Sequence, residues 1–91
     1  AWDQPALGAL QAIEAAGRAG EGIVVTGIDA NPQAREAIAA GGPFEASVAQ
    51  DFQGIGKAAA DAVGRLLAGE TIREPVTFVP TTLVTQANAA G

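Results

Sequence analysis

The sequence contains no cysteine and no histidine. Without cysteine it has no disulfide bond and no thiolate that could bind a metal or attack a substrate. Without histidine it lacks the side chain on which most zinc sites, Ser-His-Asp triads and imidazole acid–base catalysis depend. These two absences remove the commonest catalytic and metal-binding groups. We therefore expect no catalytic residue, no metal site and no cofactor in this chain.

Basic residues are also scarce. Five lysines and arginines stand against ten aspartates and glutamates, which gives a formal net charge of −5 at pH 7. Nucleic-acid-binding domains need a basic stripe or patch that neutralises phosphates. The scattered basic residues of this chain form none, so we expect no nucleic-acid partner. Long apolar runs are missing too, and no stretch of about 18 apolar residues is present that could span a bilayer as a helix.

What the sequence does contain is an alternation of apolar runs and helix patterns within 91 residues. This length suits one small domain or a piece of a larger one. A chain of this size buries only about 60–65% of its unfolded surface, so its core is thin. Its first residues, Ala1-Trp2-Asp3, lead directly into a helix pattern, although an α/β fold normally places a strand there. We therefore expect the chain to begin inside a larger fold.

The most informative stretch is the apolar run at residues 23–28 and the polar residues that follow it. A continuous apolar run predicts a strand that is covered on both faces. Asp29 follows where this strand should end, and Asn31 can cap the next helix with Pro32 at its first position. In open parallel sheets, ligands bind outside the carboxyl ends of the strands. Asp29 is therefore a candidate ligand-binding residue, although a turn residue or a helix cap is the simpler interpretation.

The rest of the chain follows the same helix and strand patterns. Helices are predicted at residues 4–16, 33–40 and 52–68, strands at 23–28 and 46–50, and extended chain at 76–79 and 83–85. The two strands should be parallel, because a helix pattern lies between them. Asp3 and Asp51 are predicted to cap their helices, and residues 87–91 to fray. The third helix should bury an apolar stripe made of Phe52, Ile55, Ala59, Val63, Leu66 and Leu67.

Polar or aromatic residues precede each of the three predicted helices, and these junctions could converge on one cleft. The pairs are Trp2-Asp3, Ile28-Asp29 and Gln50-Asp51. Simpler interpretations exist for two further residues: Trp2 could be a core or terminal plug, and Gln50 a polar residue at the end of a strand. An enzyme with a Mg²⁺ site or a phospho-accepting aspartate is an alternative. It is disfavoured because the aspartates lie on separate junctions, without a well-placed lysine.

Four segments in this order, residues 2–13, 24–29, 46–51 and 79–85, resemble the C-terminal third of the periplasmic sugar-binding proteins. These form the ribose-binding-protein-like group that serves ABC importers, and the resemblance covers essentially the whole chain. It implies an α/β fold with a parallel sheet flanked by helices, the C-terminal fragment of a two-lobed fold with sugar in the cleft. Residues 1–50 would belong to the C-terminal lobe, 51–79 would pack on the N-terminal lobe, and 80–91 would return to the C-terminal lobe and form the tail.

The resemblance also implies a ligand site. Asp29 matches the strand-end aspartate that accepts hydrogen bonds from sugar hydroxyls, Gln50 matches the hinge glutamine, and Ile28 lies where a wall residue is found. Trp2 stands where ribose binders have an asparagine, which argues against ribose and suggests a sugar face stacked on the indole. The chemistry agrees, because a carboxylate accepts strong hydrogen bonds, an amide both donates and accepts, and an indole offers a flat apolar face.

The function that the resemblance implies is binding of a monosaccharide, a pentose or a hexose, as the solute-binding component of an ABC transporter. Its partners would be the permease subunits of the importer, together with a missing lobe or a second copy of the chain. Its location would be periplasmic or extracellular. Two alternatives remain: the effector-binding domain of a LacI-type transcription repressor, and a remnant or engineered fragment that binds nothing. The chain lacks the helix-turn-helix of a repressor, and its residues 46–51 and 82–85 look more like the transport proteins.

Overall fold

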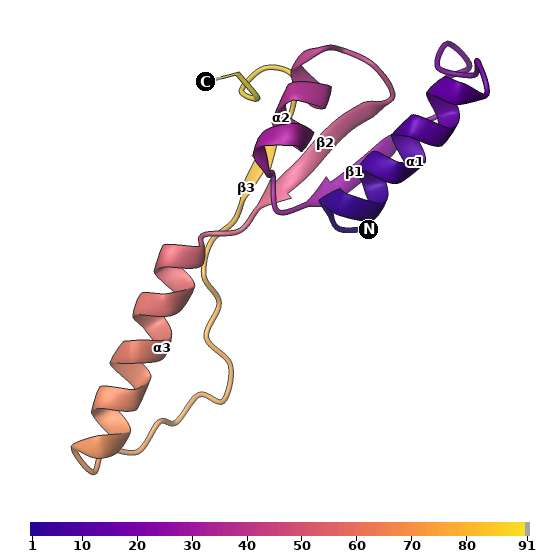
Figure 1. Ribbon diagram of the computed structural model, residues 1–91. Helices are drawn as coiled ribbons and strands as arrows, with labels where there is room; N and C mark the ends of the chain where they lie inside the picture. The colour runs from indigo at the N-terminus through magenta and orange to yellow at the C-terminus, as the bar shows by residue number, and fades with distance from the viewer. Residues whose placement is uncertain (91) are drawn as a thin grey trace. The chain divides into compact units, whose positions relative to one another are not determined.

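The computed structural model describes residues 1–90 and divides the chain into two units. One unit comprises residues 1–50 together with the chain from Thr82 onward, and the other comprises Asp51–Thr81. The elements in chain order are α1 (Asp3–Ala15), β1 (Val25–Ile28), α2 (Pro32–Ala39), β2 (Phe44–Ala49), α3 (Phe52–Leu67) and β3 (Thr82–Val84) (Figure 1). All of them lie in the first unit except α3. The α/β fold expected from the sequence is therefore confirmed.

The first unit is built on a three-stranded mixed sheet with the order β1-β2-β3. β1 and β2 are parallel, as predicted, and Ile28 lies opposite Val48. β3 is antiparallel to β2, and Ala49 at the end of β2 lies opposite Thr82 at the start of β3. The sequence predicted extended chain at residues 83–85 but neither a strand nor its direction, because strand pairing depends on the path of the chain between β2 and β3.

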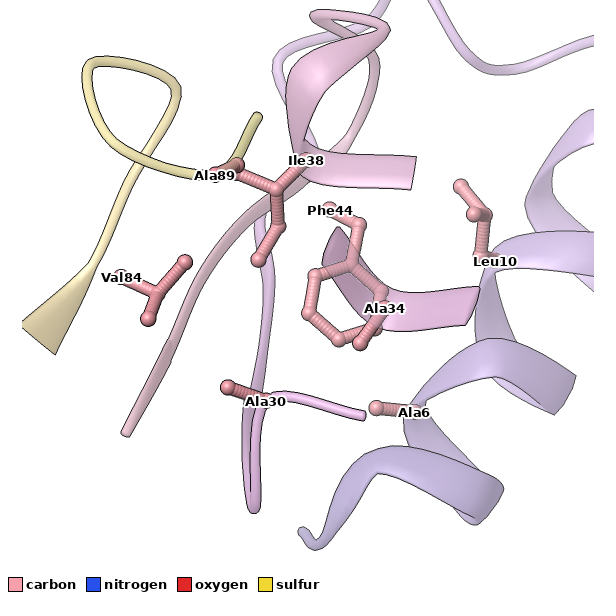
Figure 2. Packing of buried hydrophobic residues seen from close by; sticks show 8 residues of the cluster. All are labelled: Ala6, Leu10, Ala30, Ala34, Ile38, Phe44, Val84 and Ala89. Atoms are coloured by element: carbon pink, nitrogen blue, oxygen red, sulfur yellow. The ribbon is translucent and has the colours of Figure 1, made fainter. Parts of the chain in front are cut away.

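One face of this sheet carries the core, which α1 and α2 cover (Figure 1). Phe44 lies at the centre, with Ala34 of α2 against its ring, Leu10 of α1 on one side and Ile38 on the other (Figure 2). Ala6, Ala30, Val84 and Ala89 complete the cluster. Because half of these residues are alanines, the helices lie close to the sheet and the core is as thin as the composition suggested.

The predicted boundaries shift by a few residues. β1 begins only at Val25, while β2 begins two residues earlier than predicted, at Phe44. The predicted fraying of the tail is wrong for the described residues. Asn88 donates to the Leu83 carbonyl at 3.0 Å and accepts from the Thr85 N–H at 2.8 Å, and the turn that results buries Ala89 in the core. Gly91 lies outside the described residues.

The second unit consists of α3 and an irregular segment. The predicted cap is confirmed, because Asp51 Oδ1 accepts a hydrogen bond from the Gly54 N–H at 2.9 Å. The apolar stripe predicted for α3 is present but uncovered within the described residues, since α3 has no buried residue and Leu67 is 84% exposed. The reason is that residues 68–81 form no helix or strand that could cover it. Within residues 1–90, no helix is both long and apolar enough to cross a membrane.

Candidate ligand-binding site

Asp29 and Gln50 meet at the carboxyl ends of β1 and β2. Gln50 Nε2 donates to Asp29 Oδ1 at 2.9 Å, and both side chains are half-buried. The pairing of the strands continues one residue beyond β1, because the Asp29 N–H donates to the Val48 carbonyl at 2.8 Å. One carboxylate oxygen, the amide oxygen and the second amide N–H take no part in this bond. The pair therefore offers acceptors and a donor at the edge where open α/β sheets bind ligands.

The backbone at this edge is strained. Asp29 has φ 117° and Ala30 has φ 54°, and they are the only non-glycine residues with positive φ among the described residues. Left-handed conformations are several-fold commoner for aspartate than for most residues, but alanine has no such preference. A residue held in a sparsely populated region costs about 1–3 kcal/mol, and such strain clusters at functional sites where surrounding contacts enforce it.

A buried hydrogen-bond network supplies those contacts. The Ala30 N–H donates to Ser47 Oγ at 3.0 Å, and the Ser47 hydroxyl donates to Asp3 Oδ1 at 2.7 Å. The Asn31 N–H donates to Asp3 Oδ2, also at 2.7 Å. Asp3 and Ser47 are each only 1% exposed. The network thus links the start of α1, the middle of β2 and the junction that follows β1, and it leaves both carboxylate oxygens of Asp3 bonded.

Gly27 makes room for this network. It lies opposite Ser47 in the sheet, and a Cβ atom at this position would overlap Asp3 Oδ1 and come within 3.0 Å of the Phe44 ring. Gly27 therefore allows a close approach, and the neighbour is the Asp3 carboxylate. Only a residue without a side chain lets α1 lie this close to β1.

The predicted capping role of Asp3 is wrong. The N-cap position of α1 is Trp2, whose side chain makes no capping hydrogen bond, and Asp3 belongs to the first helical turn with its carboxylate bonded to other elements. The role of Ser47 in this network was not predicted from the sequence. The available signal was a hydroxyl side chain within an otherwise apolar short strand, but its partner lies 44 residues away and no local pattern identifies it.

Trp2 and Ile28 are exposed apolar side chains, 61% and 44% accessible, and Ile28 directly precedes Asp29 in the chain. Trp2 is tied to the same edge through its neighbour Asp3, which binds Asn31. Ile28 lies on the face of the sheet opposite the core, in a shallow cavity of about 330 Å³ that Ala1 and Leu83 also line. Within the described residues, no hydrogen bond joins Trp2 to Asp29 or Gln50. The structure therefore brings two of the four expected residues, Asp29 and Gln50, into direct contact.

The three aspartates of the junctions have separate partners. Asp3 binds Ser47, Asp29 binds Gln50, and Asp51 caps its own helix. The part of the chain that the structure describes contains no group of three acidic side chains that could hold a metal ion. The acceptors and the donor of the Asp29–Gln50 pair suit neutral, hydroxyl-rich ligands.

Comparison with protein families gives one match over most of the chain. The profile described as "Periplasmic binding protein domain" matches residues 1–71. A curated relative, the putative rhizopine-binding protein of Rhizobium meliloti, is 44% identical over 88 residues. That alignment covers 97% of this chain but only 28% of the relative.

Solved structures agree with this match. An ABC sugar transporter subunit from Rhodobacter sphaeroides is 42% identical with a TM-score of 0.80, and the match covers 96% of this chain and 30% of that one. An ABC transporter solute-binding protein from Agrobacterium vitis with bound allitol is 36% identical with a TM-score of 0.86, and the match covers 99% and 30%. One from Mycobacterium smegmatis with bound glycerol is 29% identical with a TM-score of 0.77, covering 93% and 28%. The chain thus spans about 30% of the length of these proteins.

Proposed function

The chain belongs to the periplasmic binding protein family, and we propose that it forms part of a solute-binding protein of an ABC importer. In this proposal Asp29 and Gln50 bind hydroxyl groups of a sugar or polyol. Its relatives include an ABC sugar transporter subunit and solute-binding proteins with bound allitol and bound glycerol. No enzymatic step is proposed, because these relatives are transport proteins and the site residues suit binding.

The observation that carries the proposal is the hydrogen bond between Asp29 and Gln50 at the ends of two parallel strands. The amide holds one carboxylate oxygen, so the carboxylate is oriented before a ligand arrives. The other carboxylate oxygen can accept from a hydroxyl, and the amide oxygen and its second N–H can accept from and donate to a neighbouring hydroxyl. Adjacent hydroxyls that both donate and accept are what sugars and polyols present.

Trp2 and Ile28 complete the proposed site as its apolar part. An exposed indole covers the C–H face of a sugar ring or an extended polyol, and hydrogen-bonding groups then hold its edge. Within this class, a monosaccharide such as a pentose or a hexose is the ligand we propose first. An acyclic polyol is the second candidate, and allitol bound to one relative is the reason for including it.

We further propose how the two units divide between lobes. Residues 1–50 and the chain after about residue 80 would belong to one lobe, and 51–79 would pack on the other. The exposed apolar side chains of α3 support this, because an uncovered stripe on a helix needs a partner. The permease subunits of an importer would be the protein partners, and the periplasm or the cell exterior the location.

Isothermal titration calorimetry of the full product of the gene tests this function. The panel contains pentoses, hexoses, allitol and glycerol, with titration of Mg²⁺ as the control for the enzyme alternative. We expect one sugar or polyol to bind, and the 91-residue chain alone to bind it much more weakly because a second wall is absent. Failure of the full product to bind any member of the panel would contradict the proposed function. Equally tight binding by the 91-residue chain would contradict the two-lobe arrangement.

A further inference from the structure

We infer that Asp3 and Ser47 are positioning residues that hold Asp29 in its ligand-binding geometry, and that they do so through the backbone of residues 30 and 31. The inference rests on the proposed function, because it takes Asp29 to be a ligand-binding residue. It concerns two side chains that do not contact the proposed ligand, since each is only 1% exposed.

The junction that follows β1 has an unusual backbone conformation. Asp29 and Ala30 both have positive φ, and two such non-glycine residues in succession do not persist unless other contacts enforce them. The direction of the Asp29 carboxylate depends on this backbone. A relaxed junction would turn the side chain away from Gln50, whose amide lies 2.9 Å from Asp29 Oδ1.

The contacts that enforce this conformation fall on the residues immediately after Asp29. Ser47 Oγ accepts from the Ala30 N–H at 3.0 Å, and Asp3 Oδ2 accepts from the Asn31 N–H at 2.7 Å. The carbonyl of Ala30 accepts from Arg35 Nε at 3.1 Å. Both peptide groups that follow Asp29 are therefore fixed by side chains from other parts of the fold.

Water cannot easily replace these contacts, because Asp3 and Ser47 are buried. The Ser47 hydroxyl donates to Asp3 Oδ1 while it accepts from Ala30, so both of its functions are used and its orientation is fixed. Both groups are buried, and removal of the hydroxyl would leave a buried N–H and a buried carboxylate oxygen without a partner. The junction would respond by relaxing toward solvent.

The test measures binding by Ser47→Ala in the full product of the gene by calorimetry, with pentoses, hexoses, allitol and glycerol as the probes. Ile38→Val is the matched control, because Ile38 is equally buried and belongs to the core but bonds to no residue of the junction. Loss of an outer partner of a metal ligand weakens metal binding about 10- to 100-fold. By analogy we expect Ser47→Ala to raise the Kd about 10-fold. Ile38→Val should leave the Kd unchanged, although it should lower the Tm about as much as Ser47→Ala does. Ser47→Thr, which restores the hydroxyl, should recover the affinity.

A double-mutant cycle separates this inference from the proposed function. Where Asp29 is already replaced by alanine, Ser47→Ala should weaken binding no further, because its effect passes through Asp29. Unchanged affinity of Asp29→Ala would overturn the proposed site itself. Weakened binding by Asp29→Ala together with wild-type affinity of Ser47→Ala would overturn only the positioning role. Equal losses of affinity in Ser47→Ala and Ile38→Val would reduce Ser47 to a stabilising residue and also overturn it.

An independent readout needs no ligand. In NOESY spectra of the ¹⁵N-labelled protein, residues with positive φ give strong intraresidue NOE cross-peaks between HN and Hα, because these two protons lie close together. We expect these for residues 29 and 30 in the wild type and in Ile38→Val, and we expect them to weaken in Ser47→Ala. Retention of both cross-peaks in folded Ser47→Ala would show that the hydroxyl does not enforce the junction.

Discussion

Gln50 Nε2 lies 2.9 Å from Asp29 Oδ1, although 21 residues separate the two in the sequence. This contact exists because β1 and β2 are parallel and end at the same edge of the sheet. The pair combines a carboxylate with an amide, so it presents acceptors on both residues and a remaining donor on one. Its consequences can be tested directly.

The first prediction concerns the carboxylate of Asp29. Hydrogen bonds to charged groups contribute about 1.5–3 kcal/mol, so Asp29→Ala should weaken ligand binding roughly 10- to 150-fold in the full product of the gene. Asp29→Asn should weaken it less, because asparagine keeps one acceptor and also tolerates positive φ. Calorimetry with the ligand from the panel measures both. Equal affinities of the aspartate and alanine proteins would remove Asp29 from the site.

The second prediction concerns the space at Gly27. A methyl group there would collide with Asp3 Oδ1, so Gly27→Ala should destabilise the protein by about 1–3 kcal/mol, the range typical of overpacking. Gly8→Ala is the matched control, because Gly8 lies in α1 with open space around it. It should stabilise the protein by up to about 1 kcal/mol. Urea denaturation gives both values, and a neutral Gly27→Ala would show that the carboxylate can move aside at no cost.

How far the sequence predicted this site depends on the distance over which each feature is encoded. Asn31 and Pro32 indicate the start of α2 from neighbouring residues alone. The structure confirms this start, since Asn31 Oδ1 accepts a hydrogen bond from the Ala34 N–H at 2.8 Å. The parallel pairing followed from a helix between two strands. Asp3 looked like a cap because a cap is its commonest local role, whereas its actual partners lie 28 and 44 residues away.

The same distinction applies to α3 and β3. The periodicity of residues 52–68 correctly indicated an amphipathic helix, but it contains no information on which element covers the apolar stripe. The direction of β3 depends on the path of the whole second unit, which no short window of sequence describes. The roles of Trp2 and Ile28 in binding stay predictions, because the structure shows only their exposure.

The third prediction concerns the cap of α3. Asp51 satisfies the Gly54 N–H, and α3 has no buried side chain to stabilise it through packing. Loss of an N-cap costs about 1 kcal/mol, so Asp51→Ala should lower the helix content measured by circular dichroism of the 91-residue chain. Asp61→Ala, an exposed change in the interior of the same helix, should leave the helix content unchanged or raise it slightly. Equal spectra for Asp51→Ala and the wild type would show that the cap contributes nothing.

The fourth prediction concerns the 91-residue chain in isolation. Exposed apolar stripes favour association, and the exposed fractions of Leu67 and Phe78 are 84% and 91%. Analytical ultracentrifugation should show self-association that increases with concentration. Leu67→Lys combined with Leu66→Glu should reduce this self-association. Leu10→Ala in the core should lower the stability of the chain but leave the self-association in place. A wild-type chain that sediments as a monomer at all concentrations would contradict this expectation.

The pairing of Ala49 with Thr82 has a consequence for how the chain can change in length. β2 and β3 form the two arms of a β-hairpin, and the whole second unit is the connection between them. The entropy of closing a loop rises only with the logarithm of its length, by about 0.6 kcal/mol for each doubling. The strands therefore place little restriction on what is inserted between them. A short turn or a larger domain could replace residues 51–81 while the sheet and its three strands keep the same register.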